Sequence, residues 1–325
     1  MTCAHRYIQK RGESQWGFGI CHSLTQNLLY RKQWDPCNGR PVNKGHEQYG
    51  YCQAGTSLDL MDDNNIVLGS PGPYTWRGTV FVNNLGEGIR DDRKWYIGPL
   101  DESPVDKYSY LGMAVTSGKF FGNQKSFVAG APRSQGTGQV VFFRKEKKGI
   151  TDLTVELMYS GKQIASSFGY SLTALDINHD GYDDLVVGAP FYFSDHEGGA
   201  IYVYLSSETG IGTDTVPNYY TGKPESRFGF AIASAGDLNR DDFTDLAVGA
   251  PYEGTGVVYI YLGSKTGLNK EPSQIIQASD FPKQVLSRTN LATFGYSISG
   301  TLDLDGNGYP DLLIGNYESD TVTLL

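Results

Sequence analysis

The stretch that decides the fold is FGYSLTALDINHDGYDDLVVGAP, residues Phe168 to Pro190. Its centre, residues 176–184, places oxygen-bearing side chains at alternate positions, and Gly181 and Tyr182 occupy the bend. The apolar run Leu185–Val187 follows directly, and a strand of that composition is expected to be buried on both faces. The stretch therefore predicts two short strands joined by an acidic hairpin loop.

The same pattern returns along the chain at a spacing of about sixty residues. The tripeptide GAP and its variants mark the copies, at 69–71, 130–132, 188–190, 249–251 and, in degenerate form, 315–317. An FG pair precedes the last three, at 168–169, 228–229 and 294–295. Behind each GAP, a glycine-rich turn leads into an alternating strand such as QVVFFRK, AIYVYL or VVYIYL, and a weaker strand such as QIIQAS follows. Four strands per repeat predict an all-β fold, a β-propeller with four-stranded blades.

The acidic loop also returns, in the same register, in the last three copies. Oxygen donors at positions 1, 3, 5 and 9, with a backbone carbonyl from position 7, match the ligand order of a calcium loop. The predicted metal ligands are Asp176, Asn178, Asp180, Tyr182 and Asp184; Asp237, Asn239, Asp241, Phe243 and Asp245; and Asp303, Asp305, Asn307, Tyr309 and Asp311. The sequence thus predicts three structural Ca²⁺ sites.

These loops differ from an EF-hand, because position 12 holds Val187, Val248 or Ile314 in place of a bidentate Glu. The competing explanation is a plain polar hairpin turn, since Asp, Asn and Gly all form turns. Three loops at one place in three repeats favour the metal. Gly181 and Gly308 permit the tight bend, whereas Asp242 replaces that glycine in the middle loop and is expected to be left-handed there or to weaken the site.

Composition narrows the functional classes. The chain has 325 residues and a formal charge of −9, which argues against a nucleic-acid partner. It has no apolar run as long as a membrane span and no signal peptide at its start, so it is expected to be intracellular or a piece of a longer protein. The histidines are dispersed and no GxSxG, HExxH or P-loop motif occurs, so we expect no enzyme.

The four cysteines, Cys3, Cys21, Cys37 and Cys52, all lie early in the chain and form no CxxC pair. An even number in one region indicates two disulfides and an oxidising compartment. Three pairings are possible, of which we favour the neighbouring one, and four buried thiols in a cytosolic protein remain the alternative.

With the repeat in hand, the chain resembles the FG-GAP head of integrin α subunits. The similarity extends to TCAHRY, WDPCNGRPVNKGHEQYGYCQAG, LGSPGPYTWRGTV and FGYSISGTLDLDGNGYPDLLIG, and it is greatest to the laminin-binding branch that lacks an inserted I domain. The family head has seven blades, and the resemblance implies that this chain starts inside the second. It also implies the neighbouring disulfides, Cys3–Cys21 and Cys37–Cys52.

The resemblance divides the single propeller domain, 1–325, into a partial second blade at 1–48 and the third to seventh blades at 49–106, 107–164, 165–224, 225–290 and 291–325. We interpret the chain as a fragment of a longer receptor, with the first blade, the legs and the membrane helix missing. The expected location is the extracellular side of a single-pass membrane protein at the cell surface. An accessory propeller of a secreted enzyme and a soluble lectin-like propeller remain the alternatives.

By resemblance, the chain pairs with an integrin β subunit and binds a matrix protein such as laminin across the two subunits. The predicted ligand-binding residues are Tyr74, Thr75, Trp76 and Arg77 in one loop and Asp101, Glu102, Asp106 and Lys107 in another. Aromatic residues and arginine are enriched at interface hot spots, although Trp76 could instead pack between blades. Lys107 argues against simple recognition of an RGD ligand. The predicted β-subunit interface is an aromatic cup for a cationic finger, made by Tyr110, Tyr170, Phe230 and Tyr296.

Overall fold

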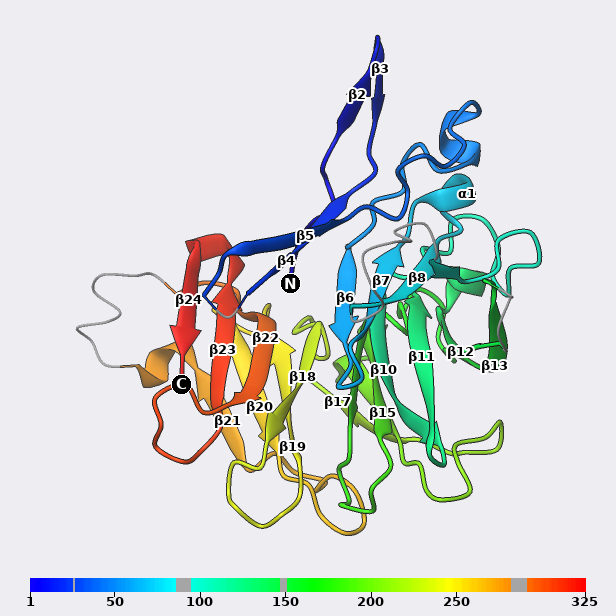
Figure 1. Ribbon diagram of the computed structural model, residues 1–325. Helices are drawn as coiled ribbons and strands as arrows, with labels where there is room; N and C mark the ends of the chain where they lie inside the picture. The colour runs from blue at the N-terminus through cyan, green and yellow to red at the C-terminus, as the bar shows by residue number, and fades with distance from the viewer. Residues whose placement is uncertain (26, 86–94, 147–150, 282–290) are drawn as a thin grey trace. The chain divides into compact units, whose positions relative to one another are not determined.

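The computed structural model describes residues 1–325 apart from 26, 86–94, 147–150 and 282–290 (Figure 1). The chain forms two compact units, the first made of residues 1–117 and 126–160, the second of residues 118–125 and 161–325. Within the described residues, no helix has the length and apolar character needed to cross a membrane. The prediction of an all-β fold is confirmed, because antiparallel sheets make up both units.

The first unit begins with a three-stranded sheet of order β1-β4-β5, and the small hairpin β2–β3 projects away from it (Figure 1). The next two sheets have the orders β6-β7-β8-β9 and β10-β11-β12-β13, and the turn between β10 and β11 belongs to the second unit. The strands are β1 (Thr2–Ala4), β2 (Gln9–Arg11), β3 (Ser14–Trp16), β4 (Ile20–Leu24), β5 (Tyr30–Trp34), β6 (Ser57–Leu60), β7 (Asn65–Ser70), β8 (Thr79–Asn84), β9 (Tyr96–Ile97), β10 (Ala114–Phe121), β11 (Gln124–Ala131), β12 (Gln139–Lys145) and β13 (Leu153–Ser160). Short helical turns are η1 (Gly45–Glu47), α1 (Pro73–Trp76) and η2 (Ser134–Gly136).

The second unit holds sheets of order β14-β15-β16-β17, β18-β19-β20-β21 and β22-β23-β24. The strands are β14 (Ser171–Leu175), β15 (Asp184–Phe193), β16 (Gly198–Tyr204), β17 (Asn218–Thr221), β18 (Ala231–Gly236), β19 (Asp245–Ala250), β20 (Val257–Tyr261), β21 (Gln274–Gln277), β22 (Phe294–Leu302), β23 (Asp311–Asn316) and β24 (Thr321–Leu324). Single turns η3 (Ala278–Asp280) and η4 (Tyr317–Ser319) follow β21 and β23. Each sheet of this unit runs in sequence order, so its blades are up-and-down meanders, as the repeat predicts.

The repeat fixes the register within these sheets. Leu172 pairs with Val187 across β14 and β15, and the equivalent pairs in the next two sheets are Ile232 with Val248 and Ile298 with Ile314. The side chains of the run Leu185–Val187 in β15 are fully buried, and β19 is buried along its whole length, whereas β23 leaves Leu313 39% exposed. The expectation that the strand holding Leu185–Val187 is buried on both faces is therefore confirmed.

The glycines of the repeat are required where neighbouring blades meet. A Cβ on Gly188 would collide with the carbonyl oxygen of Gly229, the FG glycine of the next repeat, and Gly249 has the same relation to Gly295. The N–H of Gly229 donates a 3.0 Å hydrogen bond to the carbonyl of Gly249 within its own repeat. The FG phenylalanines Phe168, Phe228 and Phe294 fill the spaces beside these contacts and are at most 1% exposed.

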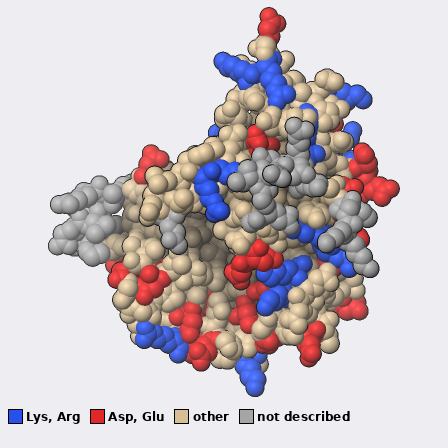
Figure 2. All heavy atoms as spheres, in the orientation of Figure 1, with Lys and Arg blue, Asp and Glu red and all other residues tan. Residues whose placement is uncertain are grey.

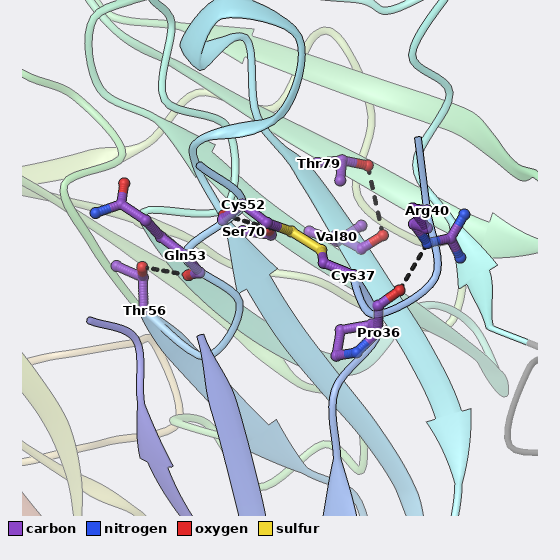
Figure 3. The surroundings of a disulfide bond; sticks show 9 residues. All are labelled: Pro36, Cys37, Arg40, Cys52, Gln53, Thr56, Ser70, Thr79 and Val80. Carbon is purple, nitrogen blue, oxygen red and sulfur yellow. Dashed lines mark hydrogen bonds between the residues drawn. A yellow bond between two sulfur atoms is a disulfide. The ribbon is translucent and has the colours of Figure 1, made fainter. Parts of the chain in front are cut away.

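Two disulfides join the cysteines in the neighbouring pairing, Cys3–Cys21 and Cys37–Cys52, so the alternative of free thiols is wrong. Around the second bond, the hydroxyl of Ser70 donates a 2.6 Å hydrogen bond to the carbonyl of Cys52 (Figure 3). Nε of Arg40 donates a 2.6 Å hydrogen bond to the carbonyl of Pro36 (Figure 3). This disulfide cross-links the long loop between β5 and β6 within itself, and the hydrogen bond from Ser70 joins that loop to the end of β7.

Candidate metal loops and interface residues

The first acidic loop, between β14 and β15, is organised around Asp176. Its carboxylate accepts hydrogen bonds from the backbone N–H of Asp180 at 3.1 Å and of Gly181 at 2.8 Å. The carboxylate of Asp180 accepts one from the N–H of Tyr182 at 3.0 Å. At the base of the loop, the carboxylate of Asp184 accepts from the N–H of Ile177 at 3.0 Å. The loop is thus folded so that its carboxylates face its own centre.

The other two loops repeat this network position by position. The position-1 carboxylates, Asp237 and Asp303, accept from the N–H groups at positions 5 and 6 of their loops. The position-9 carboxylates, Asp245 and Asp311, accept from position 2 at 2.8 Å and 2.6 Å respectively. Three loops that have the same residue only at positions 1 and 9 therefore keep one arrangement of acceptor oxygens.

The position-9 carboxylates are unusual because they are buried. Asp184 and Asp245 are both 0% exposed, and each also accepts a hydrogen bond from the strand behind it, from the N–H of Ser206 at 2.7 Å and of Gly263 at 2.9 Å. Burial raises the pKa of Asp184 to about 7, against the lowering effect of its two backbone hydrogen bonds, and burial likewise raises the pKa of Asp245. A carboxylate buried beside further carboxylates either takes up a proton or stays ionised because a positive charge compensates it.

The donor set fits a hard divalent cation. Carboxylate oxygens of Asp303, Asp305 and Asp311 lie within 4.8 Å of one another. In the first loop, Oδ1 of Asn178 is buried and accepts no hydrogen bond from any described residue, while its Nδ2 donates to Asp180 at 3.1 Å. A buried acceptor with no donor, placed among carboxylates, is the kind of oxygen that a Ca²⁺ ion would use.

The bends of the loops have the backbone that the sequence indicates. Gly181 and Gly308 have φ of +89° and +88°, where a side chain would be strained. Asp242 occupies the same place in the middle loop with φ of +70°, so the expected left-handed aspartate is confirmed. Position 4 of the first two loops, His179 and Arg240, is also left-handed, at +55° and +61°.

The first predicted ligand loop forms a left-handed turn. Tyr74, Thr75 and Trp76 have φ of +54°, +62° and +53°, a run of strained residues that tertiary contacts must stabilise. The ring of Trp76 stacks on Tyr51 at 6.0 Å and on Tyr108 at 6.4 Å between centroids. Trp76 is therefore packed and half-buried within the first unit.

Arg77 joins the two predicted ligand loops. Its Nη1 donates a 2.5 Å hydrogen bond to the carbonyl of Leu100, immediately before Asp101. Asp101 and Glu102 are exposed and line a hollow of 850 Å³ together with Tyr74. Asp106 and Lys107 are also exposed, whereas Arg77 is committed to holding the second loop.

Three of the four residues predicted for the aromatic cup form a continuous row in the second unit. Tyr170 and Phe230 have ring centroids 5.0 Å apart, and Phe230 and Tyr296 are 4.7 Å apart. Tyr317 extends the row, stacked on Tyr296 at 4.8 Å. Tyr110 belongs to the first unit, where Arg133 lies over its ring at 5.1 Å.

Sequence reasoning missed Tyr317 and a second cluster beside this row. The guanidinium of Arg227 lies 3.9 Å from the ring centroid of Tyr252 and 5.2 Å from that of Phe191, beside a hollow of 510 Å³. Two signals pointed there. Arg227 immediately precedes the FG pair, and Phe191 and Tyr252 each directly follow a GAP tripeptide, while Tyr317 is the last residue of the degenerate copy. On the face seen in Figure 2, acidic and basic side chains are interspersed over the described surface.

Comparison with known proteins matches these observations to a family. Residues 168–204, 228–261 and 294–324 match the FG-GAP repeat, the three copies that carry the acidic loops. The whole chain aligns with integrin α-7 of Rattus norvegicus and integrin α-6 of Gallus gallus at 40% identity, and with integrin α-3 of Cricetulus griseus at 36%. The chain is an integrin α homologue. It covers 29%, 31% and 31% of these relatives, and its fold class is the FG-GAP β-propeller.

Proposed function

We propose that this integrin α homologue is the ligand-binding head of a cell-adhesion receptor, displayed outside the cell and paired with an integrin β subunit. The observation that carries the proposal is the alignment of the whole chain with integrin α subunits at 35–40% identity. It is supported by the three FG-GAP repeats and by the two disulfides, which suit an oxidising compartment.

The row Tyr170–Phe230–Tyr296 supports the proposed docking of the β subunit. Its rings stand side by side, so a cationic side chain of the partner would meet several π faces at once. Tyrosine is neutral at physiological pH, and burial raises the pKa of Tyr170 and Tyr296 still further from that range. Tyr110 is proposed as a further contact from the first unit.

The proposed ligand is a laminin, read by the loops at Tyr74–Arg77 and at residues 101–107. Tyr74 lines the same hollow as Asp101 and Glu102, so this surface combines an aromatic anchor with two exposed carboxylates. Basic side chains on the matrix protein would complement that charge. The role of Arg77 in this account is to position the second loop through the carbonyl of Leu100.

The three acidic loops are proposed to bind Ca²⁺. Each loop would supply side-chain oxygens from positions 1, 3, 5 and 9, three of them from carboxylates and one from the amide at position 3 or 5. The backbone carbonyl of position 7 would add a further ligand, from Tyr182, Phe243 or Tyr309. The bound ion would neutralise the clustered carboxylates and hold each hairpin closed. The buried Oδ1 of Asn178 and the group Asp303, Asp305 and Asp311 support this proposal.

The test is a binding assay on the chain co-expressed with an integrin β subunit in secreted form. Co-purification of the two subunits, followed by calcium-dependent binding to immobilised laminin, would support the proposal. Co-purification without laminin binding would reject laminin as the ligand and would still support pairing with the β subunit. Failure to co-purify, with the chain folded by circular dichroism, would contradict the receptor function.

A further inference from the structure

Neighbouring acidic loops of the second unit contact each other through one recurrent pair of positions. The guanidinium of Arg240, at position 4 of the middle loop, lies 4.0 Å from the ring centroid of Tyr309, at position 7 of the last loop. Its Nε donates a 3.2 Å hydrogen bond to the carbonyl of Gly308, and its Nη2 donates to the same oxygen. Arg240 thus contacts the last loop at two points, the backbone carbonyl of Gly308 and the aromatic ring of Tyr309.

The preceding pair of loops makes the equivalent contact. His179, at position 4 of the first loop, meets the ring of Phe243, at position 7 of the middle loop, edge to face at a centroid separation of 6.5 Å. In both pairs of loops, therefore, the position-4 side chain of one loop contacts the aromatic ring at position 7 of the next. The His179 contact is an aromatic pair alone, whereas Arg240 adds two hydrogen bonds.

The point of attachment in the last loop is close to its acceptor oxygens. Gly308, whose carbonyl Arg240 holds, donates its own N–H to Oδ2 of Asp303 at 2.8 Å. The next residue, Tyr309, donates its N–H to Asn307 at 2.7 Å. Arg240 of the middle loop thus contacts the same stretch of backbone that donates hydrogen bonds to the acidic side chains of the last loop.

We propose that Arg240 couples the two loops, so that a cation bound in the middle loop increases the calcium affinity of the last loop. The physical basis is a loss of conformational freedom that the two loops share. A cation that orders residues 237–245 also orders Arg240, and Arg240 then holds Gly308 and Tyr309 in place before the second ion binds. This inference rests on the proposed calcium binding. Arg240 acts here as a positioning residue and supplies no ligand atom.

The experiment is hydrogen–deuterium exchange of the peptide covering residues 301–312, measured by mass spectrometry across a calcium titration. It reports the last loop alone, because the N–H groups of Gly306, Asn307 and Gly308 all donate to Asp303. The titration is repeated with Asp241→Ala, which disables the middle loop. We expect that variant to shift the calcium midpoint of the last loop upward by about fivefold.

The two titrations, with and without Asp241→Ala, are then repeated in a chain that carries Arg240→Lys. This substitution keeps the positive charge but removes the planar guanidinium group. In this background Asp241→Ala should shift the midpoint by less than about twofold, which defines a double-mutant cycle. Tyr309→Leu, which removes the ring from the other side, should also reduce the shift. Lys265→Ala is the control for an exposed cation elsewhere in the unit and should leave the fivefold shift intact.

A chelator provides a readout without metal. In EDTA, Arg240→Lys should speed the exchange of residues 301–312, and Lys265→Ala should not. If no loop gains protection with calcium, the proposed metal sites fail. If all three loops gain protection but Asp241→Ala leaves the midpoint of the last loop unchanged, the sites stand and the coupling through Arg240 is overturned.

Discussion

Gly188 lies directly against the carbonyl oxygen of Gly229, so closely that a Cβ at residue 188 would overlap it. The hydroxyl of Ser171 donates a 2.7 Å hydrogen bond to the same oxygen. The conspicuous glycine of the GAP tripeptide therefore marks the place where the second strand of one blade passes the FG turn of the next. The spacing of the blades depends on that glycine having no side chain.

Gly188→Ala is predicted to destabilise the protein by about 3 kcal/mol, because the new methyl group meets backbone that cannot rotate away. The measurement is the midpoint of guanidinium unfolding in saturating calcium. Gly212→Ala is the matched control: a Cβ there meets nothing within 4 Å, so its effect should stay within about 0.5 kcal/mol. Equal midpoints for the two variants would contradict the close-packing explanation.

Asp180→Ala is predicted to lower the melting temperature in calcium but much less in EDTA. A site filled at tenfold excess over its Kd contributes about 1.4 kcal/mol by mass action, which corresponds to a few degrees. The measurement is thermal unfolding with and without chelator. Asp214→Ala removes an exposed carboxylate of the same unit and serves as control. An equal loss in both buffers would show that Asp180 stabilises the turn through its hydrogen bond to Tyr182 and binds no ion.

Tyr296→Ala is predicted to weaken pairing with the β subunit at least about tenfold, because Phe230 and Tyr317 would both lose the ring that lies between them. Phe230 and Tyr317 both lie within 4.8 Å of the ring of Tyr296, measured between centroids. Surface plasmon resonance against the β subunit's head measures the effect. Tyr219→Ala, which removes a 61% exposed tyrosine on β17, should leave the affinity unchanged. Equal losses for both would place the interface elsewhere.

Trp76→Ala is predicted to reduce laminin binding about tenfold while pairing with the β subunit persists. The reason is that Trp76 supports the strained turn that presents Tyr74 beside Asp101 and Glu102. Both assays are run on the same preparation, with Tyr7→Ala as a control for loss of an exposed ring in the first unit. Loss of both activities would mean that Trp76 serves packing alone.

Much of this architecture could be predicted from the sequence because the repeat supplies the same information several times. Alternation after each GAP tripeptide located β12, β16 and β20, and the acidic loops located the hairpins before β15, β19 and β23. The division into two compact units could not be foreseen, because a periodic sequence gives no sign of which neighbouring blades share most contacts.

The interface residues were predicted less completely. Contacts between loops depend on side-chain direction, and the sequence does not show that Arg227 lies between Phe191 and Tyr252 or that Arg240 reaches Tyr309. The left-handed turn at Tyr74–Trp76 was also invisible, since none of its residues is glycine. The resemblance supplied the row Tyr170–Phe230–Tyr296 by position, and the structure added its continuation to Tyr317.

The most direct test of the central claim is co-purification of the chain with an integrin β subunit after co-expression and secretion. The receptor-head account predicts a calcium-stabilised one-to-one complex on size exclusion, reduced by Tyr296→Ala and unaffected by Tyr219→Ala. A folded, calcium-binding chain that elutes alone at every concentration tested would contradict it.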